Sequence, residues 1–482
     1  MLFNSSLFIV FFITVVLIYF LSPHKLRWGI LLVASCIFYM AWNPAFIMLV
    51  VFSAFSSWFA SLQIHKFSDK PAKRKTILII SLLISFGVLF VFKYLGFINE
   101  SIADLLSMLG VEFSVSKFSI ILPLGISFFT FQAVGYTVDV YGKKTVPEKK
   151  FFKYLLFIAY FPQLVAGPIE RYESLAPQLF GEKSEKKFNI DNLIIGIKFM
   201  AFGFFKKIVI ADRIAVAVNT VFNAPHLHGG LAFVIASVLF TFQIYCDFSG
   251  YSDIALGCSK VLGIDITQNF RQPFFSKNIR EFWQRWHISL SFWFRDYLYI
   301  PLGGSRCSSA RKYFNVFITF LISGIWHGAN WTFAIWGALH WVFQLFSDLI
   351  HGARKKIVPD IFGRISTFCL VSFAFIFFRA NSVADAFYIV RNLFSDFSKL
   401  SDMQYIFFTL NGFGFTFFEL IVSICFIIFL SVADGISGKE NIHSVLERKS
   451  FALRFAFYIF IFTSILVMGV YDNASDFIYF QF

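Results

Sequence analysis

The chain has 482 residues, of which 58% are hydrophobic and only 15% are charged, and 72 of them are phenylalanine. Soluble globular domains are about 45–50% apolar and about 25% charged, and they rarely expose large apolar patches. The mean hydropathy of +0.71 therefore excludes a soluble fold of this size, and it also excludes a disordered or fibrous chain. These numbers predict an all-α, polytopic membrane protein.

The net charge of +14 does not indicate nucleic-acid binding in a chain of this kind. Lys and Arg lie in short clusters between apolar runs, and cytoplasmic loops of membrane proteins carry an excess of these residues. We therefore expect membrane lipid as a partner and no nucleic acid. The six cysteines show no paired spacing, so neither a disulfide framework nor a metal site is predicted.

Residues 1–24 and 28–65 contain no Lys, Arg, Asp or Glu, and about 20 apolar residues are enough to span a bilayer. Asn43 and Pro44 divide the second run, which predicts two helices joined by a tight turn. Further uncharged runs lie at 76–92, 118–138, 154–169, 214–246, 313–347, 365–378, 420–433 and 455–471, and 192–210 is a candidate that contains Lys198. We expect roughly a dozen helices, some of them broken or re-entrant.

Basic clusters follow the first, third and fifth runs, at 24–27, 66–75 and 143–153, and another precedes the last run, at 439–454. By the positive-inside rule these loops lie in the cytoplasm. The same rule predicts that the N-terminus and the acidic tail after residue 471 lie outside.

We expect residues 1–482 to form one membrane domain, with N-terminal helices in 1–150, a catalytic core in 151–348 and C-terminal helices in 349–482. From about 160 to 312 the chain mixes Trp, Phe and Tyr with Arg, Asp and His. Charge at membrane depth is tolerated only when it is buried in protein or lines a wet cavity. A functional site is therefore expected in this region and in the apolar run that follows it.

His327 lies near the centre of the run 313–347. In a continuous helix Ser323, Asn330 and Trp331 would share its face. An ionisable group in such a run suggests a general acid or base. A structural histidine, hydrogen-bonded to a neighbouring helix, explains the residue equally well.

Two glycines and a second histidine accompany His327. Gly324 and Gly328 form a small-xxx-small pair that allows another helix to approach closely. His340 would lie about 220° around the same helix and point elsewhere, which favours a structural role for it.

Residues 280–300 are also predicted to form a helix, in which Trp283, His287, Ser291 and Arg295 lie along one stripe. An interfacial amphipathic helix explains the aromatic residues, but it does not explain a histidine among apolar neighbours.

Two shorter segments also place polar or helix-breaking residues within apolar runs. Asp247 and Asp253 follow a long apolar run, so they must face protein or water, with Asp247 favoured as a helix cap. Pro162, Gly167 and Pro168 suggest a re-entrant turn.

Four segments together resemble the membrane-bound O-acyltransferase family. They are FPQLVAGPI (161–169), YCDFSGYSDIALG (245–257), RWHISLSFWFRDYLYIPLGG (285–304) and GIWHGANWTFAIWG (324–337). They occur in the family's order, and the likeness covers nearly the whole chain. The branch that they resemble most is that of bacterial alginate O-acetyltransferases and related polysaccharide or peptidoglycan O-acetyltransferases.

The resemblance implies helices around a central tunnel or funnel in the inner membrane of a bacterium. His327 matches the family's catalytic histidine, and His287 matches a second functional histidine in the tunnel. Acyl transfer from a thioester to a hydroxyl needs a base and a donor for the oxyanion. With His327 as the base, the expected substrate-binding residues are Arg285, Asn330, Trp326, Trp331 and Asp253.

The resemblance also implies a donor and a partner. Acetyl-CoA or another acetyl thioester would react from the cytoplasmic side as a substrate, with no resident cofactor. The acetyl group would then pass to a separate periplasmic or extracellular hydrolase-like acetyltransferase. Two alternatives remain: D-alanyl transfer to teichoic acid from a carrier protein, and a transporter or flippase in which the two histidines relay protons.

Overall fold

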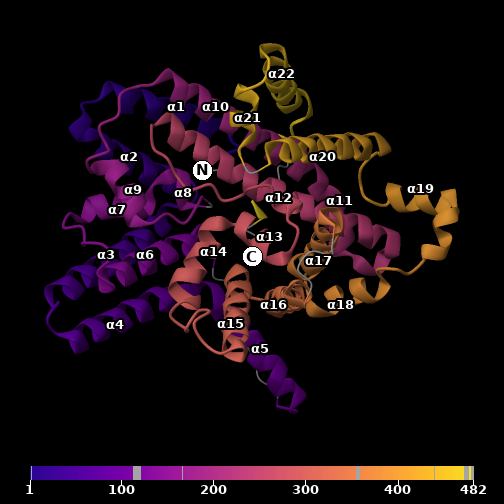
Figure 1. Ribbon diagram of the computed structural model, residues 1–482, viewed down its shortest axis with the longest axis horizontal. Helices are drawn as coiled ribbons and strands as arrows, with labels where there is room; N and C mark the ends of the chain where they lie inside the picture. Colours follow the sequence, from indigo (N-terminus) through magenta and orange to yellow (C-terminus); the bar gives the residue numbers. More distant parts are fainter. Residues whose placement is uncertain are drawn as a thin grey trace. The chain divides into compact units, whose positions relative to one another are not determined.

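The computed structural model describes residues 1, 3–111, 121–165, 167–353, 359–438, 440–471 and 477–478, with the backbone alone described for 350–353. These residues form helices and connecting turns, and they contain no strand (Figure 1). Within them, six helical stretches have the length and apolar composition to cross a membrane: Pro44–Lys66, Pro71–Met108, Gly230–Val261, Asp360–Arg379, Phe417–Ser437 and Phe451–Met468. This architecture confirms the predicted all-α polytopic class.

The described chain divides into two compact units. The first comprises Met1–Ile197 and Ala255–Thr267, and the second comprises Lys198–Ile254 and Gln268–Phe482. Two helices, α10 (Ile190–Phe204) and α12 (Gly230–Val261), contribute residues to both units. The prediction that residues 1–482 form one membrane domain stays a prediction.

The first unit confirms the predicted break at Asn43 and Pro44. The Asn43 side chain accepts a hydrogen bond from the backbone N–H of Ala45 at 3.0 Å and so caps the short turn Pro44–Phe46. The helices of this unit are α1 (Ser6–Leu21), α2 (His24–Met40), α3 (Ile47–Lys66), α4 (Pro71–Leu89), α5 (Leu95–Met108), α6 (Ile126–Tyr141), α7 (Phe151–Ala159), α8 (Phe161–Leu164) and α9 (Tyr172–Phe180). Residues 118–120 of the predicted run 118–138 lie outside the described part, as does Lys439 of the basic cluster at 439–454.

The proline- and glycine-rich segment after α7 is interrupted as predicted. Helix α7 ends at Ala159, and α8 has only four residues, all of them buried. Gly125 approaches this segment so closely that a Cβ there would overlap the carbonyl oxygen of Leu164, and its φ of +72° also favours glycine. The interruption is therefore held by packing against neighbouring backbone. Its re-entrance into a membrane stays a prediction.

Glu170 follows this segment as a buried carboxyl group. Its side chain is 4% exposed and accepts a hydrogen bond from the backbone N–H of Thr267. Burial raises the pKa of Glu170 from the ordinary 4.5 to about 7, although the bonds to Thr267 oppose the rise. No Lys or Arg forms an ion pair with Glu170 in the described part of the chain.

We expect Glu170→Gln to raise the unfolding temperature at pH 8 and to leave it nearly unchanged at pH 4, below the ordinary pKa of the group. The folded pKa of about 7 exceeds the ordinary 4.5, so the folded chain binds more protons than the unfolded chain between these values. The free energy of unfolding therefore falls by about 3 kcal/mol as the pH rises through this window. Thermal unfolding of the detergent-solubilised protein tests this, with exposed Glu173→Gln as the control. A Glu170→Gln variant with the wild-type pH dependence would contradict it.

The second unit contains a hairpin of two long helices, α15 (Ser309–His327) and α16 (Trp331–Ala353) (Figure 1). A Cβ at Gly324 would overlap the carbonyl oxygen of Phe333, and a Cβ at Gly337 would overlap that of Phe320. The close helix approach predicted at Gly324 is thus confirmed, with Gly337 as its counterpart. At Gly328 the close neighbour is the Phe333 ring.

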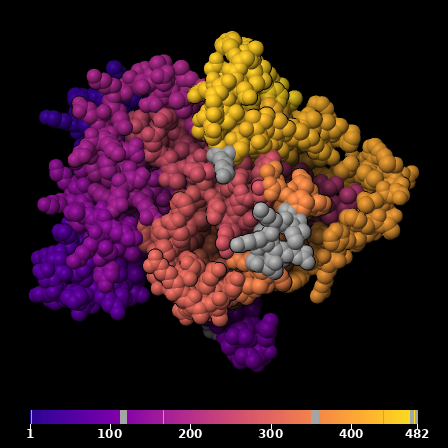
Figure 2. All heavy atoms as spheres, viewed as in Figure 1, coloured from indigo at the N-terminus to yellow at the C-terminus, as the bar shows by residue number. Residues whose placement is uncertain are grey.

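The second unit also contains the greater part of α12 and several further helices. They are α11 (Asp212–Asn223), α13 (Ile279–Arg285), α14 (Ile288–Phe294), α17 (Asp360–Arg379), α18 (Val383–Asn392), α19 (Met403–Asn411), α20 (Phe417–Ser437), α21 (Ile442–Glu447) and α22 (Phe451–Met468). Helix α22 projects from α20 and α21, in yellow in Figure 2, and only 11% of its apolar window is buried. Its apolar face is therefore available to lipid.

Candidate active site

His327 is the last residue of α15 and is 2% exposed. Its ring centroid lies 5.0 Å from Trp326, 5.1 Å from Trp336 and 5.5 Å from Phe378. The continuous helix expected beyond His327 is wrong, because Gly328 adopts an extended conformation (φ −157°) and ends the helix. The imidazole consequently lies at a helix terminus, within an aromatic shell.

This helix break separates Asn330 and Trp331 from the His327 face. Asn330 lies in the turn between the helices, where its Oδ1 accepts from the Thr332 backbone N–H at 3.0 Å and its Nδ2 donates to the Asn381 carbonyl oxygen at 3.3 Å. Trp331 begins α16 and is 57% exposed. The prediction that these two side chains share one helix face with His327 is therefore wrong. Their substrate-binding roles stay predictions.

His287 lies at a second helix break. Its φ of 42° is in the left-handed region, which is costly for a residue with a side chain, and α14 begins immediately after it. The continuous stripe predicted for 280–300 is therefore wrong. The fold holds this turn through Asn269, whose carbonyl oxygen accepts from Ile288 N–H at 3.0 Å and whose side chain accepts from Ser289 N–H at 3.2 Å.

The two helix breaks place both predicted catalytic histidines beside Trp326. The Trp326 ring lies 6.3 Å from the His287 ring and 5.0 Å from the His327 ring. His287 is fully buried and also contacts Phe248, with 4.6 Å between ring centroids. The structure therefore brings together three of the predicted site residues, His287, Trp326 and His327.

Arg285 forms its polar contacts with residues outside this group. Its guanidinium pairs with Glu281 at 2.5 Å and donates to the Gln272 carbonyl oxygen at 3.4 Å. His340 lies closer to His327 than the helical-wheel argument predicted, because both rings contact Trp336, His340 at 4.7 Å and His327 at 5.1 Å. Both ring nitrogens of His340 lack a hydrogen-bond partner within the described residues. Its setting is that of a ring packed among aromatic side chains.

The two predicted intramembrane carboxylates are ion-paired, which confirms that they face protein. Both lie within the uninterrupted helix α12, so the favoured role of Asp247 as a helix cap is wrong. Asp253 accepts from Lys206 at 2.5 Å, and Asp247 pairs with Lys207 at 2.6 Å. A π-helical turn, Phe205–Ala211, carries both lysines. Such turns occur frequently at functional sites.

Lys207 forms the centre of a larger buried cluster. Its ammonium also pairs with Asp212 at 2.7 Å, and all three side chains are at most 5% exposed. The second oxygen of Asp247 accepts a hydrogen bond from the Ile478 backbone N–H at 2.7 Å. This cluster therefore joins α11, α12 and the C-terminal segment.

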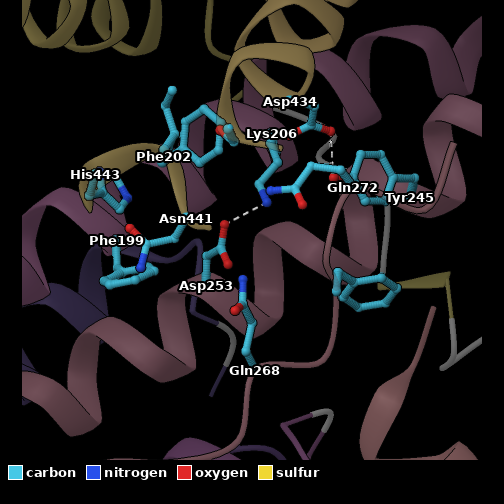
Figure 3. Close-up of a pocket in the computed structure, with 13 residues that line it drawn as sticks. Phe199, Phe202, Lys206, Tyr245, Asp253, Gln268, Gln272, Asp434, Asn441 and His443 are labelled. Atoms are coloured by element: carbon cyan, nitrogen blue, oxygen red, sulfur yellow. Dashed lines mark hydrogen bonds and ion pairs between the residues drawn. The ribbon is translucent and has the colours of Figure 1, made fainter. Parts of the chain in front are cut away.

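Asp253 lines a small polar pocket of about 30 Å³, shown in Figure 3. The Lys206 ammonium lies 4.9 Å from the Phe202 ring and 5.8 Å from the Tyr245 ring, and Tyr245 donates to Asp434 at 2.7 Å. The other lining side chains are Phe199, Gln268, Phe270, Gln272, Ser437, Asn441, Ile442 and His443. This volume is enough for one or two waters. The substrate-binding role of Asp253 stays a prediction.

The sequence reasoning missed the two buried lysines and His443. Adjacent lysines within the apolar run 192–210 were an available signal, because an ammonium at membrane depth requires a partner. His443 lies in the short helix α21, where burial and the nearby ammonium groups of Lys198 and Lys206 lower its pKa to about 3. It is therefore neutral at neutral pH.

Comparisons with known proteins show the family of this chain. Residues 148–390 match the model of the membrane-bound O-acyltransferase family. "Probable alginate O-acetylase AlgI" of Pseudomonas aeruginosa is 35% identical over 82% of this chain and 75% of the relative. "Peptidoglycan O-acetyltransferase" of Helicobacter pylori is 34% identical over 82% of this chain and 80% of the relative. "Teichoic acid D-alanyltransferase" of Bacillus subtilis is 31% identical over 53% of this chain and 68% of the relative.

The family match spans α7 to α18 and includes the two histidine-bearing helix breaks. The polytopic helical architecture agrees with an enzyme embedded in a membrane. The chain belongs to the membrane-bound O-acyltransferase family.

Proposed function

We propose that this protein transfers an acetyl group from a cytoplasmic donor across the membrane for O-acetylation of a cell-surface polysaccharide, of the alginate or peptidoglycan type. The observation that carries the proposal is the pair of relatives named for O-acetylation, each matched over 82% of the chain. The relative named for D-alanyl transfer is matched over only 53%. D-alanyl transfer to teichoic acid is therefore the second candidate.

In the proposed reaction a hydroxyl oxygen attacks the carbonyl carbon of an acetyl thioester. His327 takes the hydroxyl proton as the C–O bond forms, and it returns that proton to the thiolate when the C–S bond breaks. In this proposal the Trp326 indole N–H donates to the developing oxyanion, and the contact between its ring and that of His327 supports the assignment. His287, whose ring also contacts that of Trp326, orients the reacting groups.

The donor in this proposal is acetyl-CoA or another acetyl thioester, which approaches from the cytoplasmic side of a bacterial inner membrane. The basic clusters at 24–27, 66–75 and 143–153 support that orientation. A separate hydrolase-like acetyltransferase outside the membrane receives the acetyl group and modifies the polymer.

Deleting the gene and restoring it on a plasmid tests the proposal. Surface polysaccharide and peptidoglycan are isolated, and their ester-linked acetate and D-alanine are measured after mild alkali. We expect acetate to disappear on deletion and to return on complementation, with D-alanine unchanged. Loss of D-alanine with unchanged acetate would select the second candidate. If neither ester changed, polymer acylation would be excluded.

A further inference from the structure

The C-terminal end of α17 packs against the turn that follows His327. The Phe378 ring lies 5.5 Å from the His327 ring and 4.9 Å from the Phe333 ring. Two residues beyond the helix, the Asn381 carbonyl oxygen accepts a hydrogen bond from Asn330 Nδ2 at 3.3 Å. This segment therefore contacts both the imidazole and the turn that ends its helix.

Arg379, the last residue of α17, is held in a cage of asparagine side chains. It is 8% exposed. Its Nη2 donates to Asn219 Oδ1 at 2.8 Å and to Asn223 Oδ1 at 3.0 Å, and its Nη1 donates to Asn381 Oδ1 at 3.2 Å. Its guanidinium carbon lies 5.6 Å from the Phe222 ring centroid. The cage thus links the C-terminal ends of α11 and α17.

The partners of Arg379 indicate a geometric role. No carboxylate pairs with it among the residues that the structure describes. Three neutral amides balance less of a buried charge than a carboxylate does, although the helix C-terminus also favours a cation. The rigid, forked guanidinium fixes several acceptors at once, and one of them is the residue that binds the turn after His327.

We infer that Arg379 is a positioning residue for His327 and acts through Asn381 and Asn330. Arg379 fixes the Asn381 side chain, the Asn381 carbonyl holds Asn330, and Asn330 caps α16 through the Thr332 N–H. This inference rests on the proposed function, in which the His327 imidazole is the base. A displacement of about 1 Å in a reacting group is enough to cost about a hundredfold in rate.

Arg379→Lys and Asn381→Ala test the inference without altering a group that touches His327. Lysine keeps the charge and loses the fork, and alanine keeps the Asn381 backbone carbonyl and loses the side chain. With acetyl-CoA as the donor probe in membrane vesicles, we expect kcat to fall about tenfold to a hundredfold. The KM for the donor should stay within about twofold of wild type, because the cage does not bind the donor.

Asn330→Ser tests the link between the cage and the turn after His327. Serine still caps a helix but is too short to reach the Asn381 carbonyl, so kcat should fall as it does in the Arg379 variant. Arg391→Lys and Asn392→Ser are matched controls on α18 and should keep the wild-type kcat. A low kcat with Asn330→Ser alone would mean that Asn330 acts directly on the reacting atoms, and it would overturn the inference. A rise in KM at unchanged kcat would also overturn it.

Hydrogen–deuterium exchange supplies a measurement that does not depend on activity. Peptides covering 326–333 should exchange faster in Arg379→Lys and in Asn330→Ser than in wild type. The unfolding temperature of the protein should stay unchanged. Unchanged exchange in these peptides would refute the link between the Arg379 cage and the turn after His327, even if the enzyme proves to act on another substrate. If Arg379→Lys fails to fold, the Asn330→Ser and Asn381→Ala variants test the inference in its place. A wild-type rate in His327→Ala would refute the proposed function instead, provided that hydrogen–deuterium exchange shows the turn to be as protected as in wild type.

Discussion

Replacing His327 by alanine is expected to lower acetyl transfer by about 10²–10⁴-fold, the range that a positioned general base supplies. The imidazole is the ionisable group at the end of α15, 2% exposed and ringed by Trp326, Trp336 and Phe378. Alanine removes the proton acceptor and leaves the acceptor hydroxyl as a weak nucleophile. The initial rate of transfer from labelled acetyl-CoA in membrane vesicles measures the loss.

His340→Phe is the matched control for this variant. His340 contacts Trp336 and lies among Trp283, Phe282 and Phe320. An aromatic ring of similar size preserves that packing. We expect it to retain most of the wild-type rate. Equal losses in His327→Ala and His340→Phe would mean that disturbed packing, and not a missing base, lowers the rate.

Replacing Lys207 by methionine is expected to destabilise the protein by about 3–5 kcal/mol, because it leaves buried charge uncompensated. Lys207 lies 2.7 Å from Asp212 and 2.6 Å from Asp247, and all three side chains are at most 5% exposed. Two carboxylates would then share a site without their cation. The unfolding temperature in detergent and the amount of protein in the membrane measure the loss.

Two further variants separate charge from packing. Adding Asp212→Asn and Asp247→Asn to Lys207→Met removes the uncompensated charges and should recover much of the stability, as buried ion pairs are often replaceable together. Lys198→Met is the control, because Lys198 pairs at 3.5 Å with Glu447, whose side chain is 49% exposed, and partly exposed pairs contribute little. A triple variant as unstable as Lys207→Met would contradict the electrostatic explanation.

The membrane class followed from elementary rules on apolar runs, and the rule on buried charge showed that Asp247 and Asp253 must face protein or water. The lysines that pair with them were not predicted. The break after His327 was open to prediction from Gly328, whose extended backbone ends α15. The break at His287 was not, because no Gly or Pro lies within 285–289. That left-handed turn depends on hydrogen bonds from Asn269, which is distant in sequence.

The helix breaks also decided which predicted side chains meet. A helical-wheel argument placed Asn330 and Trp331 beside His327 and directed His340 away from it. With two helices in place of one, Trp331 is exposed, and Trp336 contacts both His327 and His340. Periodicity predicts neighbours within one helix, whereas contacts across a turn depend on how the chain reverses.

Ester-linked acetate on the surface polymer, in a deletion strain carrying either wild type or His327→Ala at equal membrane abundance, tests the central claim most directly. We predict that the wild-type gene restores acetate and that His327→Ala leaves it at the level of the deletion strain. Wild-type acetate in cells that carry His327→Ala would contradict an acetyl transfer that depends on this imidazole.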